Sequence, residues 1–354
     1  MSAEALCEFI GGVALSDAPA AVRRRVALLL SDIAAVCIAG RGAPASAIAA
    51  DHAPALGGGA EATALLDGRR LGAAGAAWAN GVLANALDFD DGHRLTKGHP
   101  GAVIVPAALA AAQLADANAA ELTPTNAPHA QLAAGGFTSA RSEFVDAPDD
   151  GLGSRWRIEE LYVKAYPCCR WSQGAIAAVL AARAGESGEA IEPTTIERVE
   201  IRTFAAADGL AKVIPSSTEE AQYNLVWPVA SALVRGRFAV ADVLGPFDDP
   251  EVASLVERVE VIVDPQLTAA FPARRLTTVE ILLRDGRRLT AGPLEAPGEP
   301  DDPDWEAIVA RKRAELIDEQ RDLAPASTNG GLRELDAPQL LGLLCGVGTV
   351  ASVA

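Results

Sequence analysis

The sequence contains few of the residues that usually mark a specialised site. Aromatic residues make up 5% of the 354-residue chain, and there are only four histidines and four lysines. No phosphate-binding P-loop, no Gly-x-Gly-x-x-Gly after a strand and no His-Glu-x-x-His is present, so the common nucleotide-binding and zinc-protease motifs are excluded. Any acid/base chemistry must therefore involve those few histidines and lysines, together with carboxylates.

Patterned cysteine, long apolar runs and positive charge are also lacking. The five cysteines fit no zinc motif, so we expect a reduced, cytoplasmic protein with Cys168 and Cys169 as packed thiols. No apolar run is long enough for a membrane span, and the start MSAEALCEF lacks the basic region of a signal peptide. The net charge of −17 argues against binding to nucleic acid or an anionic membrane. A local cationic pocket can still bind a small carboxylate.

Half of the residues are hydrophobic, and alanine is abundant, which favours closely packed helices. Apolar spacing and capping signals predict helices at residues 3–15, 17–40, 44–53, 71–87, 103–115, 172–184, 218–236, 250–258, 303–318 and 338–347. Residues 199–203 and 259–263 read as strands, and Asp285-Gly286 predicts a hairpin between 277–283 and 288–291. Pro228 should kink or interrupt the helix at 218–236.

The stretch NGVLANALDFDDGHRLTKGHPGAVIVPA, residues 80–107, has the densest chemistry in the chain. It holds three aspartates, two of the four histidines and one of the four lysines between two apolar helices. Such a group at the mouth of a helix pair predicts an acid/base site. A solvated loop with Asp and Thr helix caps is an equally good interpretation of the chemistry alone.

The segments ALDFDDGH and HPGAVIVPAALAAA in this stretch resemble the hallmark of the MmgE/PrpD family. That family includes 2-methylcitrate dehydratase, cis-aconitate decarboxylase and iminodisuccinate epimerase. Two later stretches, YVKAYPCCRWSQGAI and AQYNLVWPVASAL, resemble further family segments. The resemblance covers nearly the whole chain.

The resemblance implies a mainly α fold, with a large all-helical domain and a second, smaller α+β lid domain. The helical domain would be residues 1–190, the lid 191–322, and residues 323–354 would return to the helical domain. The active site would lie in the cleft between them. The family implies a small di- or tricarboxylate substrate, no metal, no organic cofactor and a homodimer.

Four residues are candidates for catalysis. His99 is the first choice as a base because the ordinary pKa of histidine lies near neutrality, although a buried or capping histidine is an equally good interpretation. Asp91 would orient an imidazole or hold the expelled hydroxyl. His93 is a second candidate base, with a solvent-facing loop histidine as the alternative. Lys164 corresponds to the family lysine that faces the site.

Four further residues are candidates for binding the substrate carboxylates: Arg94, Thr96, Lys97 and Arg170. A helix-capping role for Thr96 is an equally good interpretation. Asp88 and Asp90 are expected to be structural.

The chain also departs from the family pattern. Several helices that normally lie between the equivalents of Ala117 and His129 are missing, Gln173 stands near a usual histidine, and Trp227 replaces a common tyrosine. Tyr223 is expected to pack. The leading hypothesis is a lyase or isomerase for a small polycarboxylate. The alternatives are a family-derived binding or scaffold protein, and a biosynthetic enzyme with a larger substrate.

Overall fold

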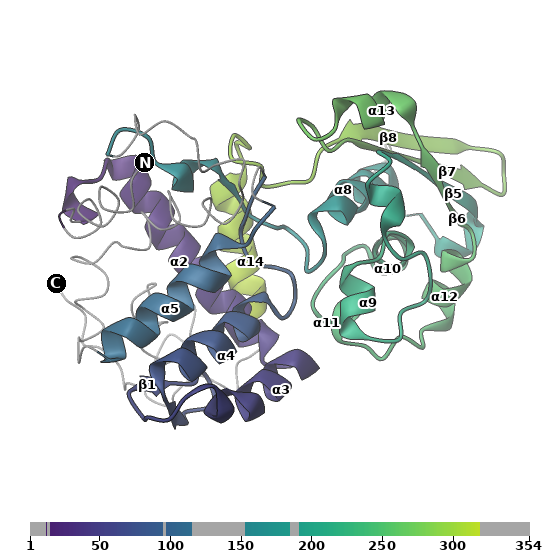
Figure 1. Ribbon diagram of the computed structural model, residues 1–354. Helices are drawn as coiled ribbons and strands as arrows, with labels where there is room; N and C mark the ends of the chain where they lie inside the picture. Colours follow the sequence, from purple (N-terminus) through teal and green to yellow (C-terminus); the bar gives the residue numbers. More distant parts are fainter. Residues whose placement is uncertain (1–11, 13–14, 95–96, 115–152, 185–190, 319–354) are drawn as a thin grey trace. The chain divides into compact units, whose positions relative to one another are not determined.

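A computed structural model of the chain describes residues 12, 15–94, 97–114, 153–184 and 191–318. These residues form two compact units (Figure 1). Unit 1 combines the chain up to Ala86, residues 90–163 and the chain from Pro300 onward, and unit 2 combines Leu87–Phe89 with Lys164–Glu299. The predicted domains divide the chain at residues 190 and 322 instead. Residues 164–184 pack with unit 2 and residues 300–318 with unit 1.

Unit 1 is a bundle of helices, as its alanine-rich apolar sequence predicts. Its helices are α2 (Ala20–Gly40), α3 (Pro44–His52), α4 (Ala73–Asn85), α5 (Pro100–Leu114) and α14 (Trp305–Asp318), with 3-10 turns at η1 (Leu15–Asp17), η2 (Ala53–Leu56) and η6 (Arg157–Glu160). Gly40 lets α2 cross α4 closely, because a Cβ there would lie 2.5 Å from the carbonyl oxygen of Leu83. The core between these helices contains Ile33, Leu83 and Leu109.

The resemblance implied an all-helical domain, but unit 1 also contains two small sheets. Strand β1 (Ala62–Thr63) pairs with β2 (Arg70–Leu71). Strand β3 (Gly92–His93) pairs with β4 (Leu161–Tyr162). The second pair places the stretch after the aspartates against a segment some 70 residues later, a contact that no local pattern encodes.

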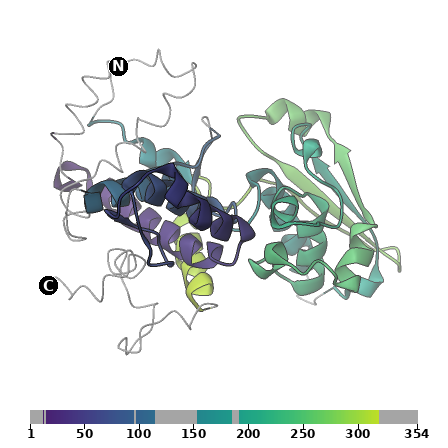
Figure 2. The ribbon, with the colours of Figure 1, turned by 60° about the horizontal axis from the view of Figure 1, so that its bottom comes forward.

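Unit 2 has the predicted α+β character. Its sheet has the order β6-β5-β7-β8, in which β5 and β6 are parallel and the other pairs antiparallel. The strands are β5 (Ile196–Thr203), β6 (Val259–Val263), β7 (Thr277–Leu283) and β8 (Arg288–Leu294). Figure 2 shows helices lying against one face of this sheet. Gly174 in α8 (Arg170–Ala184) faces the sheet, since a Cβ there would lie 3.3 Å from Leu294.

The predicted helix at 218–236 is two helices, α9 (Thr218–Gln222) and α10 (Val226–Arg235). The break comes before Pro228, not at it, because the Asn224 side chain accepts hydrogen bonds from the backbone N–H groups of Val226 and Trp227. Pro228 lies in the first turn of α10, where its missing N–H costs nothing. The remaining elements of unit 2 are η7 (Pro193–Thr195), η8 (Ala207–Gly209), α11 (Ala241–Leu244), α12 (Pro250–Val256) and α13 (Pro265–Ala270).

The predicted helices 3–15 and 338–347 and the proposed gap near residues 117–129 lie outside the described residues, apart from Gly12 and Leu15. Within the described residues, no single helix is long and apolar enough to cross a membrane, although α2 and α3–η2 pass that test together as a pair bent by 94°.

Candidate functional site

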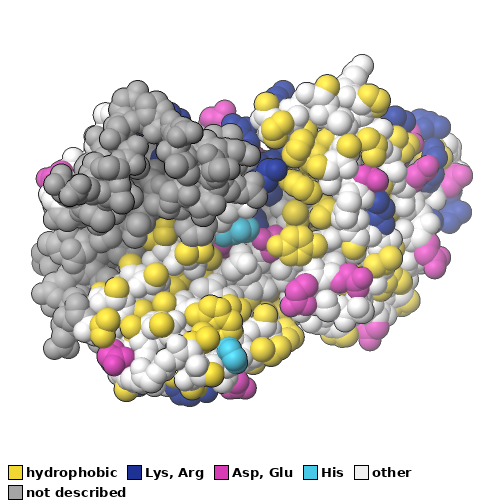
Figure 3. Space-filling view, viewed as in Figure 1, with side chains coloured by type: hydrophobic (Ala, Val, Ile, Leu, Met, Phe, Trp, Pro, Cys, Tyr) yellow, Lys and Arg dark blue, Asp and Glu magenta, His cyan; other side chains and the backbone are white. Residues whose placement is uncertain are grey.

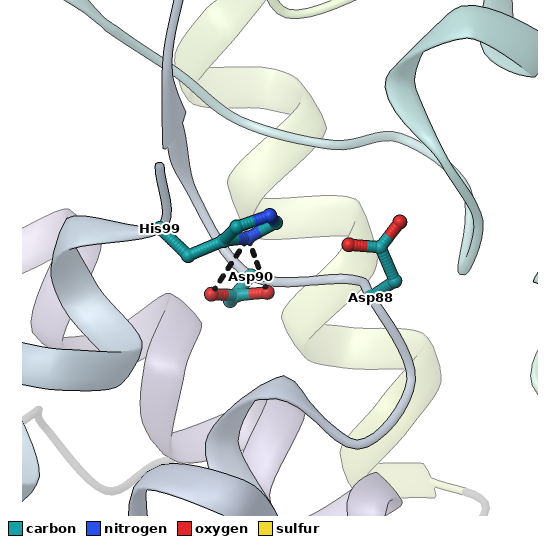
Figure 4. A group of neighbouring side chains, drawn as sticks. All are labelled: Asp88, Asp90 and His99. Carbon is teal, nitrogen blue, oxygen red and sulfur yellow. Dashed lines mark hydrogen bonds and ion pairs between the residues drawn. The ribbon is translucent and has the colours of Figure 1, made fainter. Parts of the chain in front are cut away.

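His99 and Asp90 form a carboxylate–imidazole pair in unit 1 (Figure 4). The Nδ1 atom of His99 lies 3.1 and 3.2 Å from the two carboxylate oxygens of Asp90. Asn85, the last residue of α4, donates to the same carboxylate at 2.9 Å. Asp90 is fully buried, whereas the side chain of His99 is about a quarter exposed. With Nδ1 facing the carboxylate, the proton belongs on Nδ1 and Nε2 carries the basic lone pair.

Asp91 points elsewhere, toward the start of α5. Its carboxylate accepts a hydrogen bond of 2.8 Å from the backbone N–H of Gly101, where the helix N-terminus favours negative charge. It also lines a small apolar cavity with Leu29, Ile104 and Leu161. Burial, and then the nearby charge of Asp90, raise the pKa of Asp91 to about 7.

The carboxylate that contacts an imidazole is therefore that of Asp90, and not that of Asp91 as predicted. The sequence analysis gave Asp91 the task of orienting an imidazole or of holding the expelled hydroxyl, and treated Asp90 as structural. In the structure, Asp90 contacts His99 and Asp91 caps α5. The two side chains point in different directions, and residue type alone does not reveal which of the two faces the histidine.

Asp91 should make the stability of the protein depend on pH. Its pKa rises from 3.8 to about 7 on folding, so between these values the folded protein holds a proton that the unfolded chain has released. Stability is therefore lost as pH rises through this window, by up to about 4 kcal/mol. We expect Asp91→Asn to be more stable than the wild type at pH 8 but not at pH 4, measured by urea unfolding. The exposed Asp301→Asn is the control, and a parallel pH dependence of the Asp91→Asn variant and the wild type would contradict this assignment.

Lys164 forms a buried ion pair with Asp88 in unit 2. Its Nζ atom lies 2.5 Å from a carboxylate oxygen of Asp88 and 2.7 Å from the carbonyl oxygen of the same residue. Both side chains are almost inaccessible to solvent. Asp88 has a φ of +46°, which is uncommon for a residue other than glycine. Asp is one of the residue types that adopt this conformation most readily, and the structural role that the sequence analysis gave Asp88 stays a prediction.

Two carboxylates and an imidazole of one loop, Asp88, Asp90 and His99, are residue types that bind metal ions. The ammonium of Lys164 already neutralises Asp88. This chemistry gives no reason to add a metal, and the absence of a metal or organic cofactor stays a prediction from the family resemblance.

Gln173 and Arg170, at the start of α8, organise the loop that carries Lys164. Gln173 bonds the backbone of Ala165, Tyr166 and Cys168. Arg170 is buried and donates to the carbonyls of Ala296 and Pro297 and to Glu299. These contacts hold unit 2 together, and a carboxylate-binding role for Arg170 stays a prediction.

His93 is buried. The alternative interpretation, a solvent-facing loop histidine, is therefore wrong. Its Nε2 atom lies 3.3 Å from Glu160, whose carboxylate also accepts hydrogen bonds from Arg155 and Arg157. Burial lowers the pKa of His93, and Glu160 opposes that effect. His93 therefore belongs to a different cluster from the His99–Asp90 pair.

The other predicted binding residues lie in or beside a small turn. The backbone N–H of Lys97 donates to the carbonyl of His93, and Lys97 is exposed with a φ of +52°. Arg94 is half-buried, and its charge lowers the pKa of His93. Thr96 lies outside the described residues. No role for these three is tested by the structure.

Tyr223, directly after α9, and Trp227, in α10, differ in their exposure to solvent. Trp227 is buried and donates from Nε1 to the carbonyl of Asp242, so it serves the core of unit 2. Tyr223 was expected to pack, but its side chain is 46% exposed.

Comparison with known proteins agrees with this architecture. Residues 4–142 match the model of the MmgE/PrpD N-terminal domain, and residues 166–326 match that of the MmgE/PrpD C-terminal domain. A search of curated proteins gave no match.

Proposed function

Because the chain belongs to the MmgE/PrpD family, which includes lyases such as 2-methylcitrate dehydratase, we propose that it is a dehydratase-like lyase or a related isomerase. The substrate we propose is a small di- or tricarboxylate, and the chemistry is acid/base catalysis by the protein's own side chains. The observation that carries this proposal is the His99–Asp90 pair, an oriented imidazole with a buried carboxylate behind it.

The reaction needs a base, for which we propose His99, and an acid, for which the family resemblance offers Lys164. Nε2 of His99 removes a proton from the carbon beside a substrate carboxylate, and Asp90 stabilises the imidazolium that forms. In a dehydration, the carbon–carbon double bond forms as the carbon–oxygen bond breaks, and the hydroxyl leaves as water with a proton from the acid.

Turnover tests the proposal directly. We expect purified protein incubated with 2-methylcitrate, cis-aconitate or iminodisuccinate to convert at least one of them, with the product followed by NMR. Folded protein that converts none of the three would count heavily against the proposal.

A binding or scaffold protein with reduced catalysis is the competing proposal, supported by the backbone hydrogen bonds of Gln173 at the position near the usual histidine. Tricarboxylate binding measured by calorimetry separates the two. Binding that survives His99→Ala, with no turnover in either form, would favour the scaffold. A biosynthetic enzyme with a larger substrate would instead turn over none of the three compounds and bind them weakly.

We also propose that two copies of the chain associate through α4 and α5. Neither Ala73–Asn85 nor Pro100–Leu114 contains an Asp, Glu, Lys or Arg, yet both helices have exposed residues, among them Trp78, Val103 and Leu114. Figure 3 shows largely hydrophobic and uncoloured atoms over these helices. A helix that is apolar all round is normally covered. Two chains of charge −17 repel each other least where neither carries acidic residues.

A charge placed on this face should separate the copies. We expect Ala107→Glu, at an exposed position of α5, to convert a dimer into a monomer in sedimentation equilibrium, because a dimer would bury the new carboxylate beside its symmetry mate. Ala310→Glu, exposed on the charged helix α14, adds the same charge elsewhere and should leave the dimer intact. A wild type that is monomeric at all concentrations, or an Ala107→Glu variant that stays dimeric, would exclude this interface.

A further inference from the structure

Unit 1 also contains a pocket of about 280 Å³ that the candidate site does not use. Its walls come from α3, from α4, from the loop between β1 and β2 and from the residue after α2, and we call it the α3–α4 pocket. Figure 1 shows α3, α4 and β1 close together at one end of the helix bundle. An apolar cavity of about 150 Å³ is enough to hold benzene. The pocket therefore has room for an organic molecule of roughly ten non-hydrogen atoms.

The α3–α4 pocket lies on a different side of α4 from the His99–Asp90 pair. Asn80 and Leu83 line the pocket, whereas Asn85 donates to Asp90. Because a helix has about 3.6 residues per turn, Asn85 points away from Asn80 and Leu83 by roughly 140–160°. Neither Asp90 nor His99 lines the pocket, so a ligand there would bind without occupying the candidate site.

Most of the pocket wall is apolar and built from small side chains. Ala47 and Ala50 line it from α3, Ala79 and Leu83 from α4, and Leu66 from the loop between β1 and β2. The φ of Leu66 is +62°, and for a bulky side chain such a value is a genuine outlier. Strained residues of this kind are concentrated at ligand-binding sites, where the surrounding structure holds them in place.

Asn80 holds the strained loop against α4. Its side-chain oxygen accepts a hydrogen bond of 2.8 Å from the backbone N–H of Leu65, and its side-chain amide donates to the carbonyl of Thr63 at 3.0 Å. Asn80 is itself buried, so water does not compete for these hydrogen bonds. The wall that contains Leu66 is therefore fixed before any ligand binds, as is usual for small-molecule sites.

Arg41 is the only basic residue among the described residues that line the pocket. It is exposed, and within the described part of the chain no hydrogen bond or ion pair engages its guanidinium. Two other polar residues of the lining are already engaged, the Ser46 hydroxyl with the carbonyl of Gly40 at 2.7 Å and the Asp67 carboxylate with Arg69 at 2.7 Å. A free guanidinium beside an apolar pocket favours a ligand that carries a carboxylate.

We propose that the α3–α4 pocket binds a small organic monocarboxylate. The carboxylate pairs with the guanidinium of Arg41, and an apolar body of about six carbon atoms packs against Leu66 and the alanines of α3 and α4. A di- or tricarboxylate is disfavoured, because its further charges would lie against apolar walls or beside Asp67 without a cation. The ligand therefore belongs to a different chemical class from the proposed substrate, and the pocket is a second binding site.

The test is a titration of the full chain with benzoate, and with its uncharged analogue benzamide, followed by NMR of the leucine methyl groups. The variant Leu66→Met identifies the Leu66 signals. We expect benzoate to shift these signals with a Kd in the millimolar range, and either benzamide or the variant Arg41→Met to weaken binding by about fivefold or more. Arg237→Met is the matched control, because it removes an exposed arginine from unit 2 and should leave the benzoate affinity unchanged.

Three results would overturn the proposal. They are the absence of any shift at Leu66 up to about 20 mM benzoate, equal affinities for benzoate and benzamide, and equal affinities of Arg41→Met and Arg237→Met for benzoate. Arg41 is exposed, so its replacement should preserve the fold, and a thermal melt checks this. If Arg41→Met does not fold, the comparison of benzoate with benzamide in the wild type decides alone. No step of the test measures turnover, so it does not depend on the proposed function.

Discussion

Replacement of Lys164 by methionine is expected to lower the free energy of unfolding by about 3–5 kcal/mol. The substitution keeps the length of the side chain but removes the ammonium that lies 2.5 Å from Asp88. It leaves a carboxylate buried without its counter-charge and a buried carbonyl without its donor. Urea unfolding followed by circular dichroism at pH 7 measures the loss.

The chain offers a matched control for this prediction. Lys212 forms an ion pair of 3.0 Å with Asp208, also in unit 2, but the two side chains are 37% and 44% exposed. We expect Lys212→Met to change stability by less than about 0.5 kcal/mol. The double variant Lys164→Met/Asp88→Asn should recover much of the loss, since it removes the stranded charge. Equal effects of Lys164→Met and Lys212→Met would show that the buried pair contributes nothing special.

The helices and the hairpin could be predicted because their signals are local. Pro44 begins α3 and Gly236 ends α10, as the sequence rules require. The Asp285-Gly286 turn joins β7 and β8 as expected. The gathering of scarce titratable residues in the loop between α4 and α5 could also be predicted, because it is written in the sequence itself.

The pairing within that loop could not be predicted, because it depends on distant parts of the chain. Asp88 meets a lysine 76 residues later, and Asp32 meets one 280 residues later. A positive φ at Asp88 changes the direction of the chain before Asp90. Four neighbouring positions with three identical side chains give no local signal for which carboxylate faces the histidine, so the predicted contact of Asp91 with an imidazole was wrong, and its predicted role in holding the expelled hydroxyl stays a prediction.

The division of the chain into units shows the same limit. The resemblance placed the end of the helical domain at residue 190, but α8 lies before that position and packs on the sheet of unit 2. The absence of a Cβ atom at Gly174 permits that packing. A glycine in a helix does not reveal, from the sequence alone, which surface it will face.

Replacement of His99 by asparagine is expected to reduce kcat by a factor of about 10²–10⁴, the usual contribution of a general base, with little change in folding. The imidazole is partly exposed, and its partners Asp90 and Asn85 can still bond the amide of the new side chain. Steady-state rates on whichever carboxylate is turned over, together with a thermal melt, measure both quantities. His52→Asn, at an exposed histidine on α3, is the matched control and should leave kcat unchanged.

The companion variant Asp90→Asn tests how the imidazole is used. An amide in place of the carboxylate neither stabilises the imidazolium nor fixes the proton on Nδ1, so kcat should fall while His99 itself stays in place. The acid limb of the pH–rate profile should also move to lower pH, because loss of the adjacent negative charge lowers the pKa of the imidazole. Full activity in Asp90→Asn, with a severe loss in His99→Asn, would mean that the histidine works without its carboxylate, and the base would then have to be oriented by Asn85 alone.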